Sequence, residues 1–255
     1  MGKHEVVVDK ALCIGCGLCE KDCVSGAIRV VDGKALVNLE GCISCGHCEA
    51  ICPKNAVCLL GFKEESVSFD KQTRLDPKTL MAAIKTRRTV RVFRKDGVGE
   101  EILRDIIEAG RLAPTGGNSQ GTGFIVLGTK QEAAEAVAVS MFSGLIKVAR
   151  KVIPFLRGME IDSHFFFKGA PLVIVITGDS VNASLAAENM AFMAEAHGLG
   201  VLFSGFFTMC VNHNRKVKKI LGIKKEKAVT TLVLGYPGVK YQRTAKREEA
   251  KLRIL

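Results

Sequence analysis

Eight of the ten cysteines form two copies of one spacing, C-x2-C-x2-C-x3-C, within the first 52 residues. The two runs are Cys13, Cys16, Cys19, Cys23 and Cys42, Cys45, Cys48, Cys52. Three thiolates on one tight loop can hold three corners of a four-iron cube, and the fourth ligand must come from elsewhere in the chain. The spacing therefore predicts iron–sulfur clusters, which transfer single electrons.

Two other uses of cysteine fit this pattern less well. Structural zinc sites use paired C-x2-C units with a longer gap between them, whereas each run here packs four cysteines into eleven residues. Disulfides need an oxidising compartment, and the N-terminal residues begin no secretory signal. Cys58 and Cys210 lie outside the runs and are predicted to be small buried apolar residues.

Residues 4–60 resemble the bacterial two-cluster ferredoxins, including the proline in Cys52-Pro53, although Cys23 is followed by Val24. In that family the fourth cysteine of each run binds the other cluster. The resemblance implies two [4Fe–4S] clusters with interleaved ligands. These are Cys13, Cys16, Cys19 with Cys52, and Cys42, Cys45, Cys48 with Cys23.

The composition allows one small and one medium domain in 255 residues. No apolar run reaches transmembrane length, and we interpret Gly198–Val211 as a buried helix and strand. We therefore expect a cytoplasmic protein that does not bind membranes. The net charge of +11 comes from residues beyond 60, but aromatic residues are few and no nucleic-acid motif accompanies it. We expect solvated helix surfaces and no nucleic-acid partner.

The order of elements predicts an α+β fold in two domains. We expect a ferredoxin-like domain at 1–62, a linker at 63–76 and a second domain at 77–255. Expected strands are Glu5–Val8, Lys34–Asn38, Phe124–Leu127, Leu172–Thr177 and Thr230–Leu234. Expected helices are one capped by Asp76 and starting at Pro77, then Glu100–Leu112, Glu132–Val139, Ala183–His197 and Arg215–Leu221.

No G-x-G-x-x-G follows a strand and no G-x-x-x-x-G-K-[ST] is present, so neither a dinucleotide fingerprint nor a P-loop is predicted. The second domain contains five short polar segments between its predicted helices and strands. They are Arg87–Arg91, Ala113–Gln120, Lys168–Pro171, Gly198–Gly200 and Leu234–Pro237. In this order and spacing they resemble the nitroreductase family, over about residues 77–250. The resemblance implies a homodimer with FMN at the subunit interface.

The same resemblance assigns FMN contacts residue by residue. Arg87, Arg88 and Thr89, with Arg91, would meet the phosphate and ribityl chain, since guanidinium forks suit a phosphate. Asn118 and Gln120 would bond the ribityl or pyrimidine part. Backbone amides of Ser204 and Gly205 would face the N5 and O4 edge, although the family often has an acidic residue where Ser204 stands. Arg243, with Lys246 or Arg247, would reach the phosphate. The alternative is that these basic residues of the tail are solvated surface charges.

These features together predict a flavin-dependent oxidoreductase. Its FMN would exchange electrons with the two fused clusters and reduce a small aromatic or conjugated acceptor. We see no triad or carboxylate pair and nominate no catalytic acid or base. The donor would be an external low-potential carrier. One alternative is NAD(P)H as the direct donor, and another is an electron-transfer module without its own substrate. A third is that the clusters are purely structural.

Overall fold

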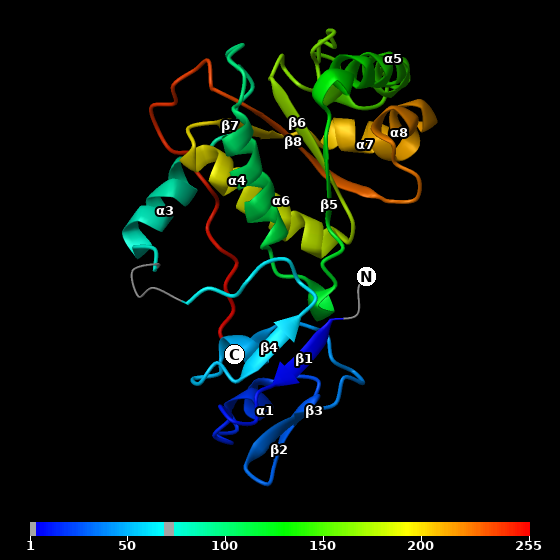
Figure 1. The fold of residues 1–255 in the computed structure, drawn as a ribbon. Coiled ribbons are helices and arrows are strands. Elements are labelled where there is room, and N and C mark those ends of the chain that lie inside the picture. The colour runs from blue at the N-terminus through cyan, green and yellow to red at the C-terminus, as the bar shows by residue number, and fades with distance from the viewer. Residues whose placement is uncertain (1–3, 69–73) are drawn as a thin grey trace. The chain divides into compact units, whose positions relative to one another are not determined.

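The computed structural model describes residues 4–68 and 74–255, and it divides the chain into two compact units (Figure 1). The first comprises the described residues of Met1–Arg74 together with Gly116–Ser119. The second comprises Leu75–Thr115 and Gln120–Leu255. Residues 69–73 of the expected linker, and residues 1–3, lie outside the described residues. The remaining parts of the linker, 63–68 and 74–76, contain no helix or strand.

The first unit contains two antiparallel strand pairs and two short helices. Strands β1 (Glu5–Val8) and β4 (Val57–Leu60) form one pair, and β2 (Ile28–Val31) and β3 (Lys34–Val37) form the other. The helices are α1 (Leu18–Asp22) and α2 (His47–Ala50). The unit repeats itself along the chain, because each cysteine of the second run stands 29 residues after its counterpart, as Cys42 does after Cys13. Strands β3 and β4 start 29 residues after β1 and β2.

Gly15 shows why the first cysteine loop needs a residue without a side chain. Its φ is +63°, and a Cβ there would lie 2.3 Å from the carbonyl oxygen of Gly33. The loop therefore lies directly against the turn between β2 and β3, which glycine permits and other residues do not.

The second unit is built on one antiparallel sheet of order β5-β6-β8-β7. Its strands are β5 (Gly123–Val126), β6 (Leu172–Thr177), β7 (Gly200–Phe203) and β8 (Ala228–Gly235). All six residues of β6 are buried, because both faces of the sheet are covered. Val173 and Val175 belong to the core on one face, and Ile174 and Ile176 belong to the core on the other.

Helices cover both faces of this sheet, as Figure 1 shows. Helices α4 (Glu100–Arg111) and α6 (Ser180–Ala196) pack over the face that carries Ile174. Helices α5 (Gln131–Ala149), α7 (Gly205–His213) and α8 (Arg215–Leu221) cover the opposite face. The unit also contains α3 (Pro77–Thr86) and short 3-10 turns at Gly128–Lys130 and Pro154–Leu156, while the turn at Gly116–Asn118 belongs to the first unit.

This architecture confirms the predicted α+β class, and most expected elements are present. Helix α5 extends well beyond the expected Val139, because Phe142 and Ile146 continue its buried side one turn apart. Gly198–Val211 does contain a strand and a buried helix, β7 and most of α7. In the part of the chain that the structure describes, no helix is both long and apolar enough to cross a bilayer.

Three local predictions have different outcomes. Asp76 caps α3 as expected, accepting a hydrogen bond from the backbone N–H of Thr79 at 2.8 Å. Burial of Cys210 is confirmed, and it raises the pKa of that thiol to about 12. The prediction for Cys58 is wrong. Cys58 follows buried Val57 in β4, so the two-residue period of the strand turns it to the exposed face.

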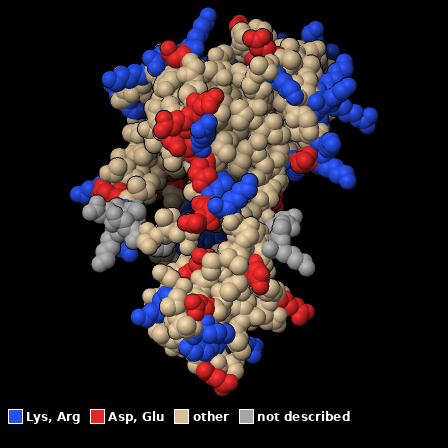
Figure 2. Space-filling view, viewed as in Figure 1, with Lys and Arg blue, Asp and Glu red and all other residues tan. Residues whose placement is uncertain are grey.

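The positive charge of the second unit lies largely on its surface. In Figure 2, Lys and Arg side chains are spread around the rim of this unit, with Asp and Glu among them. Helix α8 contributes Arg215, Lys216 and Lys219, which are exposed. Much of this charge is ordinary solvated helix surface.

Candidate functional site

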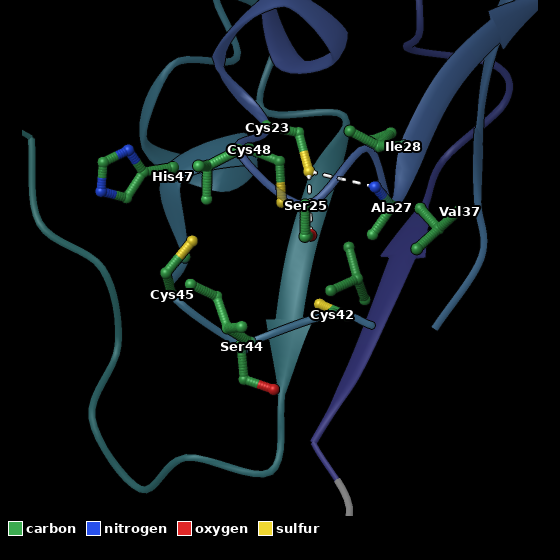
Figure 3. A pocket seen from close by; sticks show the side chains of 14 residues that line it. Cys23, Ser25, Ala27, Ile28, Val37, Cys42, Ser44, Cys45, His47 and Cys48 are labelled. Atoms are coloured by element: carbon green, nitrogen blue, oxygen red, sulfur yellow. Dashed lines mark hydrogen bonds between the residues drawn. The ribbon is translucent and has the colours of Figure 1, made fainter. Parts of the chain in front are cut away.

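The eight cysteines of the two runs line two separate cavities in the first unit. We call the cavity lined by Cys13, Cys16, Cys19 and Cys52 the first cysteine cavity. The second cysteine cavity is lined by Cys23, Cys42, Cys45 and Cys48. Figure 3 shows the second, with its four sulfurs around one space and the ring of His47 turned away. Each run thus contributes three cysteines to one cavity and its fourth to the other.

Backbone amides point at the cysteine sulfurs in both cavities. Ala35 N donates to Cys13 Sγ at 3.4 Å, and Ala56 N donates to Cys52 Sγ at 3.2 Å. Ala27 N donates to Cys23 Sγ at 3.3 Å in the second cavity. Such bonds favour the thiolate, which is the form that binds metal. The Ala35 and Gly15 amides, followed by the charges of Lys34 and Lys10, lower the pKa of the Cys13 thiol.

Burial acts in the opposite direction at Cys48, where it raises the pKa of the thiol to about 11. Four thiols around an apolar space suit a cube whose irons each take one cysteine. Among the described residues, no three His, Cys, Asp or Glu side chains converge as ligands of a single metal ion would. The four thiols that line each cavity fit the four corners of an iron–sulfur cube.

In the second unit, the segment Arg87–Arg91 is fixed against the edge of the sheet. Val90 N donates to Val201 O at 3.0 Å, and Thr89 pairs with Val201 in a parallel bridge. Gly200 permits this approach, because a Cβ there would lie 2.5 Å from Val90 Cγ2. The segment is thereby held beside β7, and its arginines have a defined position.

Two arginines of this segment carry unsatisfied buried donors. Arg87 Nη1 and Arg88 Nε are buried and have no hydrogen-bond partner. A buried donor without a partner costs free energy, so such atoms point to a missing ligand. Arg88 Nη2 donates to the carbonyl of Arg243 at 2.8 Å, which brings the C-terminal segment to this place.

Tyr241 belongs to the same arrangement, and we did not predict it from the sequence. Its hydroxyl donates to Thr89 O at 3.1 Å, and the Arg88 guanidinium carbon lies 5.7 Å from the centre of its ring. The signal that could have found it is a lone aromatic residue inside a basic tail. Arg247 and Lys246 are exposed, so their predicted phosphate contact remains a prediction.

Glu195 of α6 is the acidic neighbour of this arginine pair. Burial raises the pKa of its carboxyl to about 7, although the charge of Arg87 opposes the shift. Near neutral pH this side chain is therefore partly protonated, which leaves Arg87 incompletely neutralised.

The raised pKa of Glu195 gives a stability prediction for the flavin-free protein. Between its ordinary pKa of 4.5 and the folded value of about 7, the native state binds more protons than the unfolded state. The free energy of unfolding should therefore fall as pH rises through this range. Glu195→Gln should remove about 1–2 kcal/mol of that fall, a value discounted for partial exposure. Urea unfolding of both proteins at pH 5 and pH 8 measures the difference. An equal fall in the free energy of unfolding between the two pH values in wild type and Glu195→Gln would contradict the prediction.

A cavity of about 720 Å³ opens at the N-terminus of α7. Its lining includes Arg91, Phe165, Lys168, Ser204, Gly205 and Phe206. Helix α7 begins after Ser204 without a side-chain cap, so amides of its first turn have no intrahelical or capping acceptor. Such amides suit an electron-rich ligand edge. The volume lies within the range of about 300–1,000 Å³ that is typical of ligand pockets.

A buried carboxylate holds one wall of this cavity. Glu135 Oε1 accepts hydrogen bonds from the amides of Phe166 and Phe167, at 3.0 and 2.8 Å. Phe166 and Phe167 are buried core residues, and Phe166 also lines the cavity beside the partly buried Phe165. Lys168 Nζ lies 4.8 Å from the ring centre of Phe165. Burial raises the pKa of Glu135, and the two amides oppose that shift.

Of the predicted flavin contacts, Arg91, Ser204 and Gly205 line this cavity, and the loop that carries Asn118 and Gln120 has hydrogen bonds of its own. Asn118 lies in the segment that groups with the first unit, and its Nδ2 donates to the carbonyls of Ile43 and Ser44 at 3.1 and 2.9 Å. Gln120 N donates to Thr115 Oγ1 at 3.1 Å. Both residues have positive φ, 52° and 48°, so the loop is tightly turned here. Their flavin roles remain predictions.

Family models match both parts of the chain. A model described as the nitroreductase family matches residues 84–236. A model described as a 4Fe-4S dicluster domain matches residues 12–57, which include both cysteine runs.

Individual relatives agree with these matches. A protein of Archaeoglobus fulgidus named "Putative NADH dehydrogenase/NAD(P)H nitroreductase" is 25% identical over 155 residues, which is 60% of this chain and 83% of the relative. A Bacteroides fragilis nitroreductase structure with bound FMN is 20% identical, with a TM-score of 0.55, covering 69% of this chain and 98% of its own. A Desulfitobacterium hafniense nitroreductase with bound FMN is 21% identical, with a TM-score of 0.54, covering 71% and 100%. At these identities the solved structures show a shared fold.

Proposed function

This chain belongs to the nitroreductase family, and on that premise we propose that it is an oxidoreductase whose FMN exchanges electrons with two [4Fe–4S] clusters in its N-terminal domain. The proposal joins two kinds of site within one polypeptide. Each site is supported by its own residues.

The observation that carries the flavin proposal is the pair of buried, unpartnered donors on Arg87 and Arg88. A phosphate offers charged oxygens to both guanidinium groups and would satisfy these donors. Tyr241 and the Arg243 carbonyl hold Arg88 and Thr89 in place. The FMN-bound relatives of the same fold support this assignment.

Bound FMN supplies hydride or paired-electron transfer to an acceptor stacked on its ring. The chain's own residues orient and stabilise it. Uncapped amides after Ser204 and the guanidinium of Arg91 would stabilise negative charge on the reduced ring. The aromatic side chains of Phe165 and Phe206 line the space where a flat acceptor would enter. We assign no acid–base residue to the chain.

The two cysteine cavities would hold the clusters, with the interleaved ligands Cys13, Cys16, Cys19, Cys52 and Cys42, Cys45, Cys48, Cys23. The acceptor would be a small aromatic or conjugated molecule. We also keep the homodimer as part of the proposal, because α3 leaves Leu80, Met81 and Ile84 half-exposed in the isolated chain.

Anaerobic rapid mixing tests the central proposal. Wild-type protein with measured iron, sulfide and FMN is mixed with a reduced low-potential ferredoxin, and absorbance is followed at cluster and flavin wavelengths. We expect the clusters to be reduced first and the flavin to follow within the same mixing experiment. Fully reduced clusters beside a flavin that stays oxidised would exclude electron exchange.

A second candidate is direct reduction of the flavin by NADH or NADPH. The name of the Archaeoglobus fulgidus relative favours it. The same mixing experiment with each nicotinamide separates the two donors, because direct hydride transfer would reduce the flavin before any change at the clusters.

A further inference from the structure

We propose that the two clusters are electrostatically unequal, and that the cluster in the first cysteine cavity has the higher reduction potential. This inference rests on the cluster binding in the proposed function. It comes from the charges that the internal repeat places around each cavity.

Lysines surround the first cysteine cavity. Lys34 Nζ donates to the carbonyl of Cys13 at 2.7 Å, and Lys10 Nζ donates to the carbonyl of Ala35. Ala35 is the residue whose amide donates to Cys13 Sγ. Lys54 lines the same cavity beside Pro53. Three cations are therefore attached to or border this site.

The second cysteine cavity has no such lysines at the matching positions. The 29-residue repeat pairs Lys34 with Glu5, Lys10 with Leu39, and Lys54 with Ser25. The structure supports the pairing, because β3 carries Ala35 to the first cavity just as β1 carries Val6 to the second. The positive charge of Lys34 is thus replaced by a negative charge on the second side, and the charges of Lys10 and Lys54 have no counterpart there.

Acidic residues near the cavities do not remove this difference. Asp9 precedes the first run and matches Asn38 in the repeat, which adds one negative charge to the first site. On the second side, Asp22 stands directly before Cys23 and pairs with His47 at 2.9 Å, and Glu40 stands two residues before Cys42. The first site remains the more positive of the two.

Hydrogen bonds to sulfur do not separate the sites in the same way. Amides donate to Cys13 and Cys52 in the first cavity. In the second, Cys23 accepts from the Ala27 amide and lies 3.5 Å from Ser25 Oγ. Because both cavities have these bonds, charge is the feature that distinguishes them.

The direction of the effect follows from the charge of the cluster. Reduction adds one negative charge, which nearby cations stabilise and nearby carboxylates oppose. An electron that enters the domain should therefore rest on the first-cavity cluster before the second is reduced.

A redox titration of the full chain tests this, with the electron paramagnetic resonance signals of the reduced clusters as the readout. Wild-type protein should show two separate one-electron waves. Lys34→Gln should lower the reduction equilibrium constant of the upper wave about tenfold, equivalent to ~59 mV, and leave the lower wave in place. Glu5→Gln should raise the lower wave and leave the upper one in place.

The side chain of Lys34 also donates a hydrogen bond to the backbone, so Lys34→Gln could disturb folding as well as charge. Two further variants test the charge effect without changing Lys34. Lys54→Ser places the second-site residue at an exposed first-site position and should lower the upper wave by a smaller amount. Lys63→Met removes a cation of the same unit that lines neither cavity and should move neither wave.

Coincident waves in the wild type, or a Lys34→Gln shift confined to the lower wave, would overturn the inference. These outcomes differ from those that would show the proposed function to be wrong. If the proposed function is wrong, iron and sulfide are missing, or both clusters titrate as expected while the flavin receives no electrons.

Discussion

Arg87→Ala should give a folded protein that retains both clusters but binds FMN at least about thirtyfold more weakly, since removing one partner of a buried charged pair costs about 2–5 kcal/mol. Arg87 Nη1 is buried beside Glu195 without a hydrogen-bond partner. Removing this donor takes no hydrogen bond from that atom in the flavin-free chain, and Glu195, the acidic neighbour that then loses its cation, can take up a proton near neutral pH. The loss should therefore appear in flavin affinity and not in folding.

Fluorescence titration of flavin-free protein with FMN measures this affinity, and iron analysis confirms that the clusters remain. Arg87→Lys should recover part of the affinity, because an ammonium keeps the charge but lacks the planar fork. Arg104→Ala is the matched control, since Arg104 forms an exposed pair with Glu100 on α4. Wild-type affinity in Arg87→Ala would remove the phosphate assignment.

Cys16→Ala should separate the electron-transfer role of the clusters from a structural one. The substitution removes one thiol from the first cysteine cavity, so the protein should lose about half of its iron and sulfide. FMN should still bind, because its predicted contacts lie elsewhere in the sequence. Flavin reduction by reduced ferredoxin should slow by at least about a hundredfold, because loss of even an outer partner of a metal site costs about 10–100-fold in activity.

Cys58→Ala is the control for this experiment, because Cys58 is an exposed cysteine outside both cavities. Circular dichroism and gel filtration establish whether Cys16→Ala is folded. A soluble, flavin-loaded Cys16→Ala protein that accepts electrons from ferredoxin at the wild-type rate would show that this cluster is not on the route. If Cys16→Ala is completely unfolded, and no cluster variant slows electron delivery to the flavin while staying folded, the clusters are purely structural.

Local patterns predicted much of this fold, and contacts distant in sequence account for the rest. The cysteine spacing is a property of short loops, so it indicates iron–sulfur chemistry without knowledge of the fold. Strand β6 has the predicted bounds because its continuous apolar run lies between Pro171 and Gly178. Helix α8 has them because Asn214 caps its start and Gly222 ends it. An aromatic residue in a basic tail is at most a hint to Tyr241, and its partner Thr89 could not be found this way, since the two residues lie 152 positions apart.

Charge relationships were also beyond the sequence alone. Glu195 looks like an ordinary acidic residue of an alanine-rich helix until its burial near Arg87 is known. Lys34 is one of 37 basic residues, and its importance follows from the carbonyl of Cys13 that it contacts. For Asn118, the family resemblance predicts a flavin contact, which stays a prediction, and the structure adds the hydrogen bonds that its side-chain amide donates to the carbonyls of Ile43 and Ser44.

The exchange of the fourth cysteine between the two runs has a consequence for how this polypeptide can be cut or rearranged. A fragment that stops before Cys42 contains three thiols of one cavity and a single thiol of the other. Neither half could assemble a complete cube alone, so both halves must be present before either metal centre can form. Expressed as separate pieces, the two halves should regain their iron when they are mixed, and not before.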